Sequence, residues 1–173
     1  VYSSSIGNCN NADTSGRQGL MTNAYGSDPL CGIPVSSPMG GNYVARLNRY
    51  CQLMEGSIIE QTFTPTATER WLNYAYAVVL EDGSHGVGEQ TYFSADIIDA
   101  GGNAIPTYSV YMQAANGLTP GFYPANGNGL FGTTYYKPWT PVSLDLTAYI
   151  GQSVTIRFTA ADCIYSGHSG YAY

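Results

Sequence analysis

The sequence predicts an all-β protein, an antiparallel β-sandwich of the jelly-roll type. Segments with the two-residue apolar alternation of strands recur from residue 43 to residue 173, separated by turns rich in Gly, Asn, Asp and Pro. No window of a dozen residues combines helical periodicity with helix caps. The chain of 173 residues is long enough for one such domain. Seven or eight short strands joined by turns favour a sandwich over a helical or mixed fold.

The individual strands are expected from their alternation. The strongest is 70–80, where both faces are apolar, so this strand is expected to be central and covered on both sides. Phe93, Ala95 and Ile97 are expected to point inward from 91–99, as are Val154 and Ile156 from 153–159. The remaining strands are expected at 43–47, 57–63, 107–115, 142–146 and 170–173, and a long loop at 116–138.

Two units differ in pattern along the chain. Residues 1–42 are irregular, dominated by Gly, Ser, Asn and Pro, with few strand signals. Residues 43–173 carry the strand pattern. We therefore expect a sandwich over 43–173, preceded by a segment that is either looped by a disulfide or able to donate a strand to a neighbouring molecule.

The four cysteines are widely spaced, and no pair has the C-x-x-C spacing of a zinc or redox motif. We expect two disulfides, Cys9–Cys31 and Cys51–Cys163, although four cysteines allow three pairings and free buried thiols are the alternative. Closing the first loop would stabilise the fold by roughly 3 kcal/mol in the chain-entropy model. Disulfides would place the protein outside the cell or at its surface.

The composition excludes two classes of partner. Charged residues make up 10% of the chain, with 12 acidic and 6 basic residues and a net charge of −6. A nucleic-acid groove or a polybasic membrane patch needs clustered Lys and Arg, which are absent, and no apolar run is long enough to insert in a membrane. The chain instead has 16 Tyr and 21 Gly, which suits adhesion, sugar binding or self-assembly.

Three blocks in order carry a family resemblance. They run from Trp71 to Gln90, from Tyr92 to Asn103, and from Trp139 through Asp145-Leu146-Thr147-Ala148-Tyr149-Ile150-Gly151 to Gly167-His168-Ser169-Gly170-Tyr171-Ala172-Tyr173. The chain over about 43–173 resembles a jelly-roll module of secreted and cell-surface proteins of Bacteroidota, associated with type IX secretion. It is also similar to galactose-binding and MAM-like sandwiches, many of which hold a structural Ca²⁺. The resemblance implies an extracellular location and a non-catalytic module.

One group of residues is a candidate metal site. Glu81, Asp82 and Glu89, with Asp162 from near the last strand, offer the oxygen ligands that Ca²⁺ requires. His85 and His168 are poor calcium ligands, and with carboxylates they are a candidate zinc site. The alternative is that the carboxylates bind loop backbone and the histidines contact Tyr hydroxyls.

An aromatic loop is the candidate glycan-binding or adhesive surface. Rings embedded in Gly, Asn and Pro can stack on sugar faces if exposed, or can plug the end of the core if buried. The residues are Phe122, Tyr123, Phe131, Tyr135, Tyr136 and Trp139.

Three functions follow. The first is a non-catalytic extracellular module that binds polysaccharide or another surface ligand. The second is a structural subunit of a filament or surface layer that assembles with copies of itself by strand donation. The third, a glycan-cleaving enzyme using Glu81 and Glu89 as acid and base, has no isolated carboxylate pair to support it.

Overall fold

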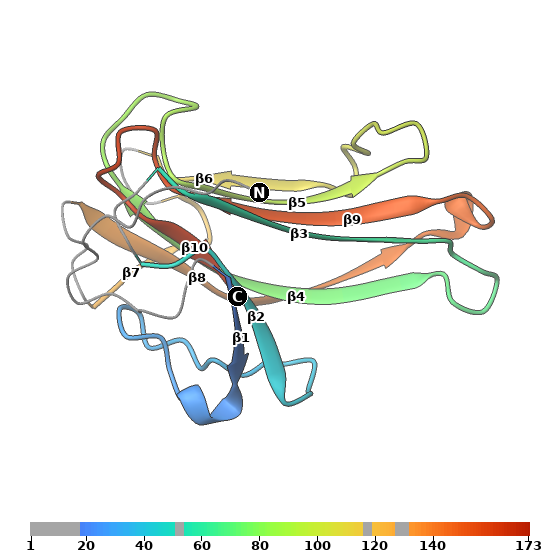
Figure 1. The fold of residues 1–173 in the computed structure, drawn as a ribbon, viewed down its shortest axis with the longest axis horizontal. Helices are drawn as coiled ribbons and strands as arrows, with labels where there is room; N and C mark the ends of the chain where they lie inside the picture. Colours follow the sequence, from blue (N-terminus) through green and yellow to red (C-terminus); the bar gives the residue numbers. More distant parts are fainter. Residues whose placement is uncertain (1–17, 51–53, 116–118, 127–131) are drawn as a thin grey trace.

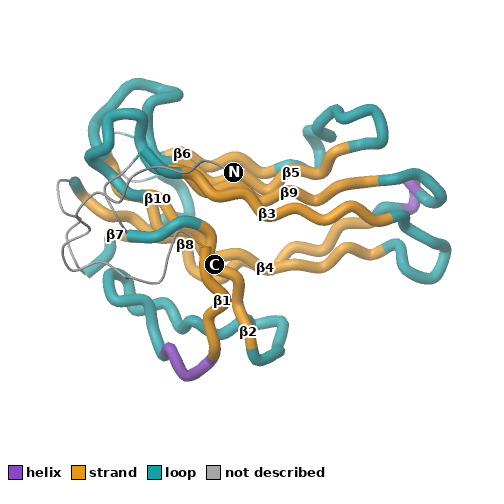
Figure 2. The backbone as a smooth tube through the Cα atoms, in the orientation of Figure 1, coloured by secondary structure: helices purple, strands orange, loops and turns teal. Residues whose placement is uncertain are grey.

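The protein is a β-sandwich of two antiparallel sheets, as the sequence predicts (Figure 1). The computed structural model describes residues 18–50, 54–115, 119–126 and 132–173. Within these ranges the only helices are two 3₁₀ turns, Asn23–Tyr25 and Thr147–Tyr149 (Figure 2). No helix among the described residues is long and apolar enough to span a membrane.

The larger sheet has six strands. In spatial order they are β1 (Gln18–Thr22), β2 (Tyr43–Leu47), β10 (Gly170–Ala172), β4 (Trp71–Asp82), β8 (Thr133–Asp145) and β7 (Tyr123–Pro124).

The smaller sheet has four strands, and the chain crosses between the sheets at most connections. Such crossing is what a jelly roll requires, and the finer jelly-roll assignment stays a prediction. The four strands are, in order, β3 (Gly56–Phe63), β9 (Val154–Ala161), β5 (Tyr92–Ile98) and β6 (Val110–Gln113).

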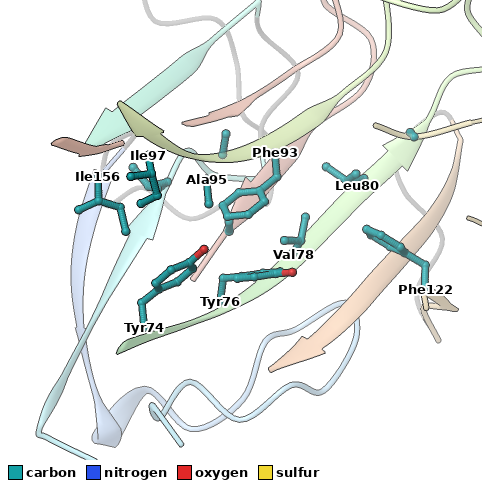
Figure 3. Close-up of a cluster of buried hydrophobic side chains, with 13 residues drawn as sticks. Tyr74, Tyr76, Val78, Leu80, Phe93, Ala95, Ile97, Phe122 and Ile156 are labelled. Atoms are coloured by element: carbon teal, nitrogen blue, oxygen red, sulfur yellow. The ribbon is translucent and has the colours of Figure 1, made fainter. Parts of the chain in front are cut away.

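Strand β4 is central and covered on both faces, which confirms the expectation from its two apolar faces. Tyr74, Tyr76, Val78 and Leu80 point between the sheets toward Phe93 (Figure 3). The alternate residues of β4 join a second buried cluster on the outer face of the larger sheet. That second cluster contains Met21, Ile33, Val35, Val44, Ala77, Val79, Tyr171 and Tyr173.

The second cluster explains how the N-terminal segment differs from expectation. Its described part, residues 18–42, contributes the edge strand β1, which pairs with β2, and a buried turn. The carboxylate of Asp28 holds this turn: Oδ1 accepts the N–H groups of Leu30 and Cys31, and Oδ2 accepts the hydroxyls of Tyr171 and Tyr173, each at 2.8 Å. The contacts that order this segment are long-range, so local alternation did not reveal them.

Strand β8 is the other difference. It begins at Thr133 and runs to Asp145, so part of the expected loop 116–138 is strand. Two prolines concealed it, because Pro has no N–H to donate to a ladder. Pro138 lies at a register shift opposite Ala77, and Pro141 lies beyond the short partner β7, so β8 has a free edge where Pro is tolerated.

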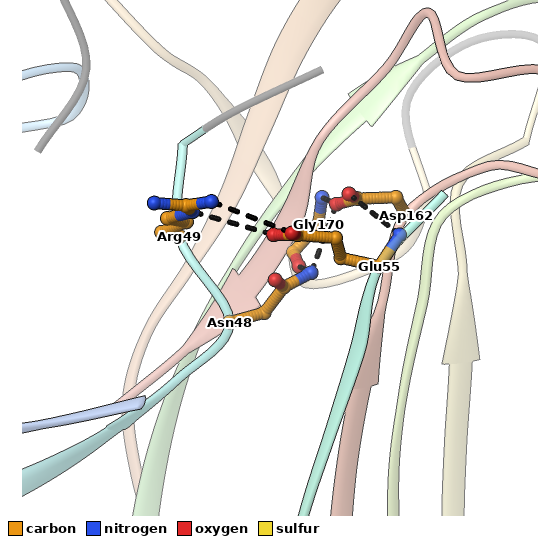
Figure 4. Close-up of polar contacts among 5 residues, drawn as sticks. All are labelled: Asn48, Arg49, Glu55, Asp162 and Gly170. Carbon is orange, nitrogen blue, oxygen red and sulfur yellow. Dashed lines mark hydrogen bonds and ion pairs between the residues drawn. The ribbon is translucent and has the colours of Figure 1, made fainter. Parts of the chain in front are cut away.

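A buried carboxylate joins both sheets at one end (Figure 4). Oδ1 of Asp162, which follows β9, accepts the side-chain amide of Asn48 at 2.9 Å and the N–H of Gly170 at 3.0 Å. Its Oδ2 accepts the N–H of Glu55 at 3.2 Å. Burial raises the pKa of this carboxyl well above its usual value, although the N–H donors of Gly170 and Glu55 act in the opposite direction. Four chain segments therefore depend on one side chain.

Replacing Asp162 should be costly. We expect Asp162→Ala to lower the free energy of unfolding by about 3–5 kcal/mol, because three buried donors lose their acceptor. Urea unfolding followed by fluorescence measures this. The exposed Glu69→Ala variant is the control and should stay within about 0.5 kcal/mol of the parent. Equal effects of the two substitutions would contradict the assigned role.

Candidate functional site

Two loops meet at one end of the sandwich (Figure 1). The first joins β4 to β5 and carries His85. The second joins β9 to β10 and carries Cys163 and His168. The backbone N–H of Ile164 donates to the carbonyl of Glu89 at 3.1 Å, which ties the loops together. Residues that are some 80 positions apart in the sequence are thus neighbours at this end.

The two histidines and one cysteine form a compact cluster. His85 Nε2 lies 3.1 Å from His168 Nδ1, and Cys163 Sγ lies 3.5 Å from the same nitrogen. Cys163 is fully buried and His168 nearly so, whereas His85 is half-buried. Among the described residues this is the one group of three or more His, Cys, Asp or Glu whose ligand atoms converge, all within 4.8 Å of one another.

Side chains of the first loop fix the position of His85. The amide of Gln90 accepts the N–H of Gly83 at 3.1 Å and donates to Asp82 Oδ1 at 2.9 Å and to the His85 carbonyl at 3.3 Å. Glu89 accepts the N–H of Gly86 at 2.9 Å. These hydrogen bonds within the loop therefore restrict the movement of His85.

The second loop is braced against the first. Glu89 Oε1 accepts the hydroxyl of Tyr165 at 2.8 Å, and the ring of Tyr165 packs on that of His85 at a centroid distance of 4.7 Å. The hydrogen bond from Tyr165 is the main cause that lowers the pKa of Glu89, with His85 a minor one. Cys163 N–H donates to the His168 carbonyl at 3.2 Å, which closes the second loop on itself.

Glycine at position 83 makes the approach of the histidines possible. A Cβ on Gly83 would overlap the imidazole of His168 and would lie 2.7 Å from Cδ2 of His85. Gly167 is different, since a Cβ there would meet nothing within 4 Å. The sequence therefore has no side chain where the cluster needs the space.

The four carboxylates that the sequence predicts as Ca²⁺ ligands accept hydrogen bonds from other groups. Glu81 accepts the N–H groups of Gly132 and Ser169, and Asp82 accepts that of Ser84. Asp162 belongs to the network of Figure 4, and Glu89 braces the loops. The described residues do not bring these four carboxylates to one point. Calcium binding stays a prediction. The observed hydrogen bonds to backbone N–H groups are those of the alternative, in which the carboxylates bind the backbone of the loops.

Neither predicted disulfide is formed at the described cysteines. Cys31 and Cys163 are both buried free thiols. Cys31 Sγ donates to Asp28 Oδ1 at 3.0 Å, and burial next to that carboxylate raises the pKa of the thiol. Cys163 contacts His168 instead. The expected partners, Cys9 and Cys51, lie outside the described residues.

The aromatic loop divides between the two expected roles. Phe122 is 4% exposed and packs in the core next to Leu80 (Figure 3), whereas Tyr123 is 54% exposed with its ring 5.8 Å from that of Tyr136. Tyr135, Tyr136 and Trp139 are half-buried, and Phe131 lies outside the described residues. The indole N–H of Trp139 donates to the Pro34 carbonyl at 2.8 Å.

A groove that the sequence did not reveal opens between the sheets, alongside β2 and β3. It encloses about 330 Å³, and its floor reaches Tyr76 and Phe93 of the core. It was missed because its walls come from strands distant in sequence; the only local sign was an apolar residue, Ile59, on an exposed strand. The aromatic residues of its walls are Tyr43, Trp139, Phe158 and Tyr173, and its polar residues are Ser37, Glu60 and Gln61.

Comparison of the chain with protein-family models, with curated proteins and with solved structures found no significant match. The candidate sites are therefore interpreted from their own geometry.

Measurements of stability should distinguish the buried ring of the aromatic loop from the exposed ring. We expect Phe122→Ala to lower the free energy of unfolding by about 3–5 kcal/mol, because it leaves a cavity in the core. Tyr123→Ala should cost less than about 1 kcal/mol, since the ring is mostly in solvent. Urea unfolding of both variants provides the measurement. A large loss for Tyr123→Ala would mean that its ring is a core element.

Proposed function

We propose that the chain is a non-catalytic extracellular module of a bacterial cell-surface or secreted protein, and that it binds glycan in the groove between the sheets. The supporting observation is the groove itself. Its volume of about 330 Å³ falls within the range of small-molecule sites. Its aromatic walls and few polar groups match what the face of a sugar ring and its hydroxyls require.

The charge pattern fits the same ligand class. The groove is lined by one carboxylate, that of Glu60, whose Oε2 already accepts Arg157 Nε at 2.7 Å. A neutral or weakly charged polysaccharide meets no repulsion there. Tyr43 stands at the mouth with 60% of its surface exposed, so its ring is available for stacking.

Removing that ring should weaken binding. We expect Tyr43→Ala to lower the affinity for a polysaccharide identified on a glycan array about tenfold, the loss that corresponds to one aromatic contact of about 1.4 kcal/mol. Isothermal titration with the array hit measures it. Tyr111→Ala is the matched control, because Tyr111 is also 60% exposed but lies on β6, away from the groove. No binding on the array, or equal losses in both variants, would refute the proposal.

A second function, a subunit of an extracellular filament or surface layer, is favoured by strand β3. Among the described strands, this eight-residue edge strand pairs only with β9, and it exposes Ile58 and Ile59 beside the groove. Natural proteins usually protect such an edge, because it can accept another strand. Here the side chain of Gln18 caps one edge carbonyl, that of Ile58, at 3.0 Å. An extended segment of another copy would fit the remaining edge.

Against this, β1, in the described part of the N-terminal segment, pairs with β2 of its own sandwich. Assembly by strand addition predicts oligomers that Ile59→Lys abolishes, measured by light scattering and electron microscopy. Ile150→Lys is the control, a similarly exposed isoleucine away from β3. A strictly monomeric parent protein at high concentration would exclude this second function.

A further inference from the structure

We propose that His85, Cys163 and His168 bind one Zn²⁺ ion at the end of the sandwich. The residue types are those that zinc prefers, imidazole nitrogen and thiolate sulfur. Calcium and magnesium take oxygen ligands, and the four carboxylates near this end are engaged elsewhere. The donor set therefore selects a borderline metal over the hard cations.

Two of the three distances between ligand atoms match tetrahedral coordination, and all three lie within 4.8 Å. With zinc–nitrogen bonds of about 2.0–2.1 Å and a zinc–sulfur bond of about 2.3 Å, a tetrahedron has edges of about 3.3 Å between two nitrogens and about 3.5 Å between nitrogen and sulfur. The corresponding distances are 3.1 Å from His85 Nε2 to His168 Nδ1 and 3.5 Å from His168 Nδ1 to Cys163 Sγ. Small shifts of the rings would complete the geometry.

Hydrogen bonding alone does not explain the cluster. Nδ1 of a neutral imidazole is either one donor or one acceptor. At His168 this single atom is approached both by the imidazole of His85 and by the thiol of Cys163. A protonated Nδ1 has one N–H and an unprotonated Nδ1 has one lone pair, and neither can make a good hydrogen bond to both neighbours at once. A cation between the three atoms would use a lone pair from each of them simultaneously.

The surroundings hold the ligands in place before any ion arrives. Gln90 braces the loop of His85, Glu89 and Tyr165 join the two loops, and the Cys163 N–H donates to the His168 carbonyl. Supporting contacts of this kind orient ligands and raise metal affinity. The cluster thus has a supporting shell as well as three donors.

Access is from the side of His85. A cavity of about 290 Å³ lies against His85, Gln90 and Gln113. Cys163 is 0% exposed and His168 is 8% exposed, so His85 is the most accessible of the three ligands. Three protein ligands leave a fourth position, which a water or a small external ligand would take, as in open zinc sites.

Zinc binding tests the proposal directly. The reduced, chelator-treated protein should bind one equivalent of Zn²⁺ in a calorimetric titration, and Zn²⁺ should raise its Tm. Co²⁺ substituted for Zn²⁺ should give a thiolate-to-cobalt charge-transfer band. Cys163→Ser should remove the band and weaken Zn²⁺ binding at least about 100-fold. Cys31→Ser, at another buried thiol, should keep both, and near-UV circular dichroism of the metal-free variants verifies folding.

Substitutions at two glycines test the geometry of the site without changing a zinc ligand. We expect Gly83→Ala to weaken Zn²⁺ binding by about 10–100-fold, because its Cβ displaces the imidazole of His168, whereas Gly167→Ala leaves it unchanged. The proposal is overturned if the parent protein binds no stoichiometric Zn²⁺ or if Cys31→Ser removes the cobalt band. Peptide mapping that finds Cys163 in a disulfide in the native protein would overturn it as well.

Discussion

The buried carboxylate of Asp162 is the contact on which the arrangement of both sheets depends. It receives hydrogen bonds from the end of β2, the start of β3 and the start of β10, and it directly follows β9 (Figure 4). β2 and β10 belong to one sheet, β3 and β9 to the other. A buried donor without an acceptor destabilises the fold. A sliding movement of the sheets here would break several hydrogen bonds at once and is therefore unfavourable. One side chain therefore sets the register of the layers at this end.

This anchor also places the cluster of His85, Cys163 and His168. The loop that carries Cys163 and His168 begins immediately after Asp162 and ends at Gly170, and both of its ends are held by the same carboxylate. Glu81 fixes the adjoining residue by accepting the N–H of Ser169 at 3.0 Å. Rigid supports on either side make a short loop into a defined site, as metal ligation requires.

What the sequence predicted well was governed by local pattern. Strand 43–47 has the same bounds as β2, and the alternation of Phe93, Ala95 and Ile97 gave the buried face of β5. Period-two alternation reports burial directly, since successive side chains face opposite sides of a sheet. The two apolar faces of β4 even indicated the second core cluster, although not the segment that covers it.

What the sequence left out depends on distant contacts. Met21 and Val35 are buried only because β1 and the Asp28 turn fold onto the outer face of β4. The count of cysteines predicts a disulfide for Cys163, because a count gives no information about neighbours in the fold. The one available sign was the spacing of Cys163 and His168 on a single short loop. His85 completes the cluster from a loop elsewhere in the chain, and only the fold shows that.

The surface carries fewer acidic side chains than the composition indicates, because several of them are buried. Of the chain's 12 acidic residues, at least five are buried, and four of these accept backbone N–H groups in turns and loops. Long-range electrostatic steering needs clustered surface charge, so the recognition proposed for this protein does not depend on it. The proposed recognition uses short-range contacts: rings, hydroxyls and main-chain edges. The groove at Tyr43 and the open edge of β3 supply these, and the His85 cluster adds a coordinating site that needs no surface charge. The five buried residues are Asp28, Glu55, Glu81, Asp82 and Asp162.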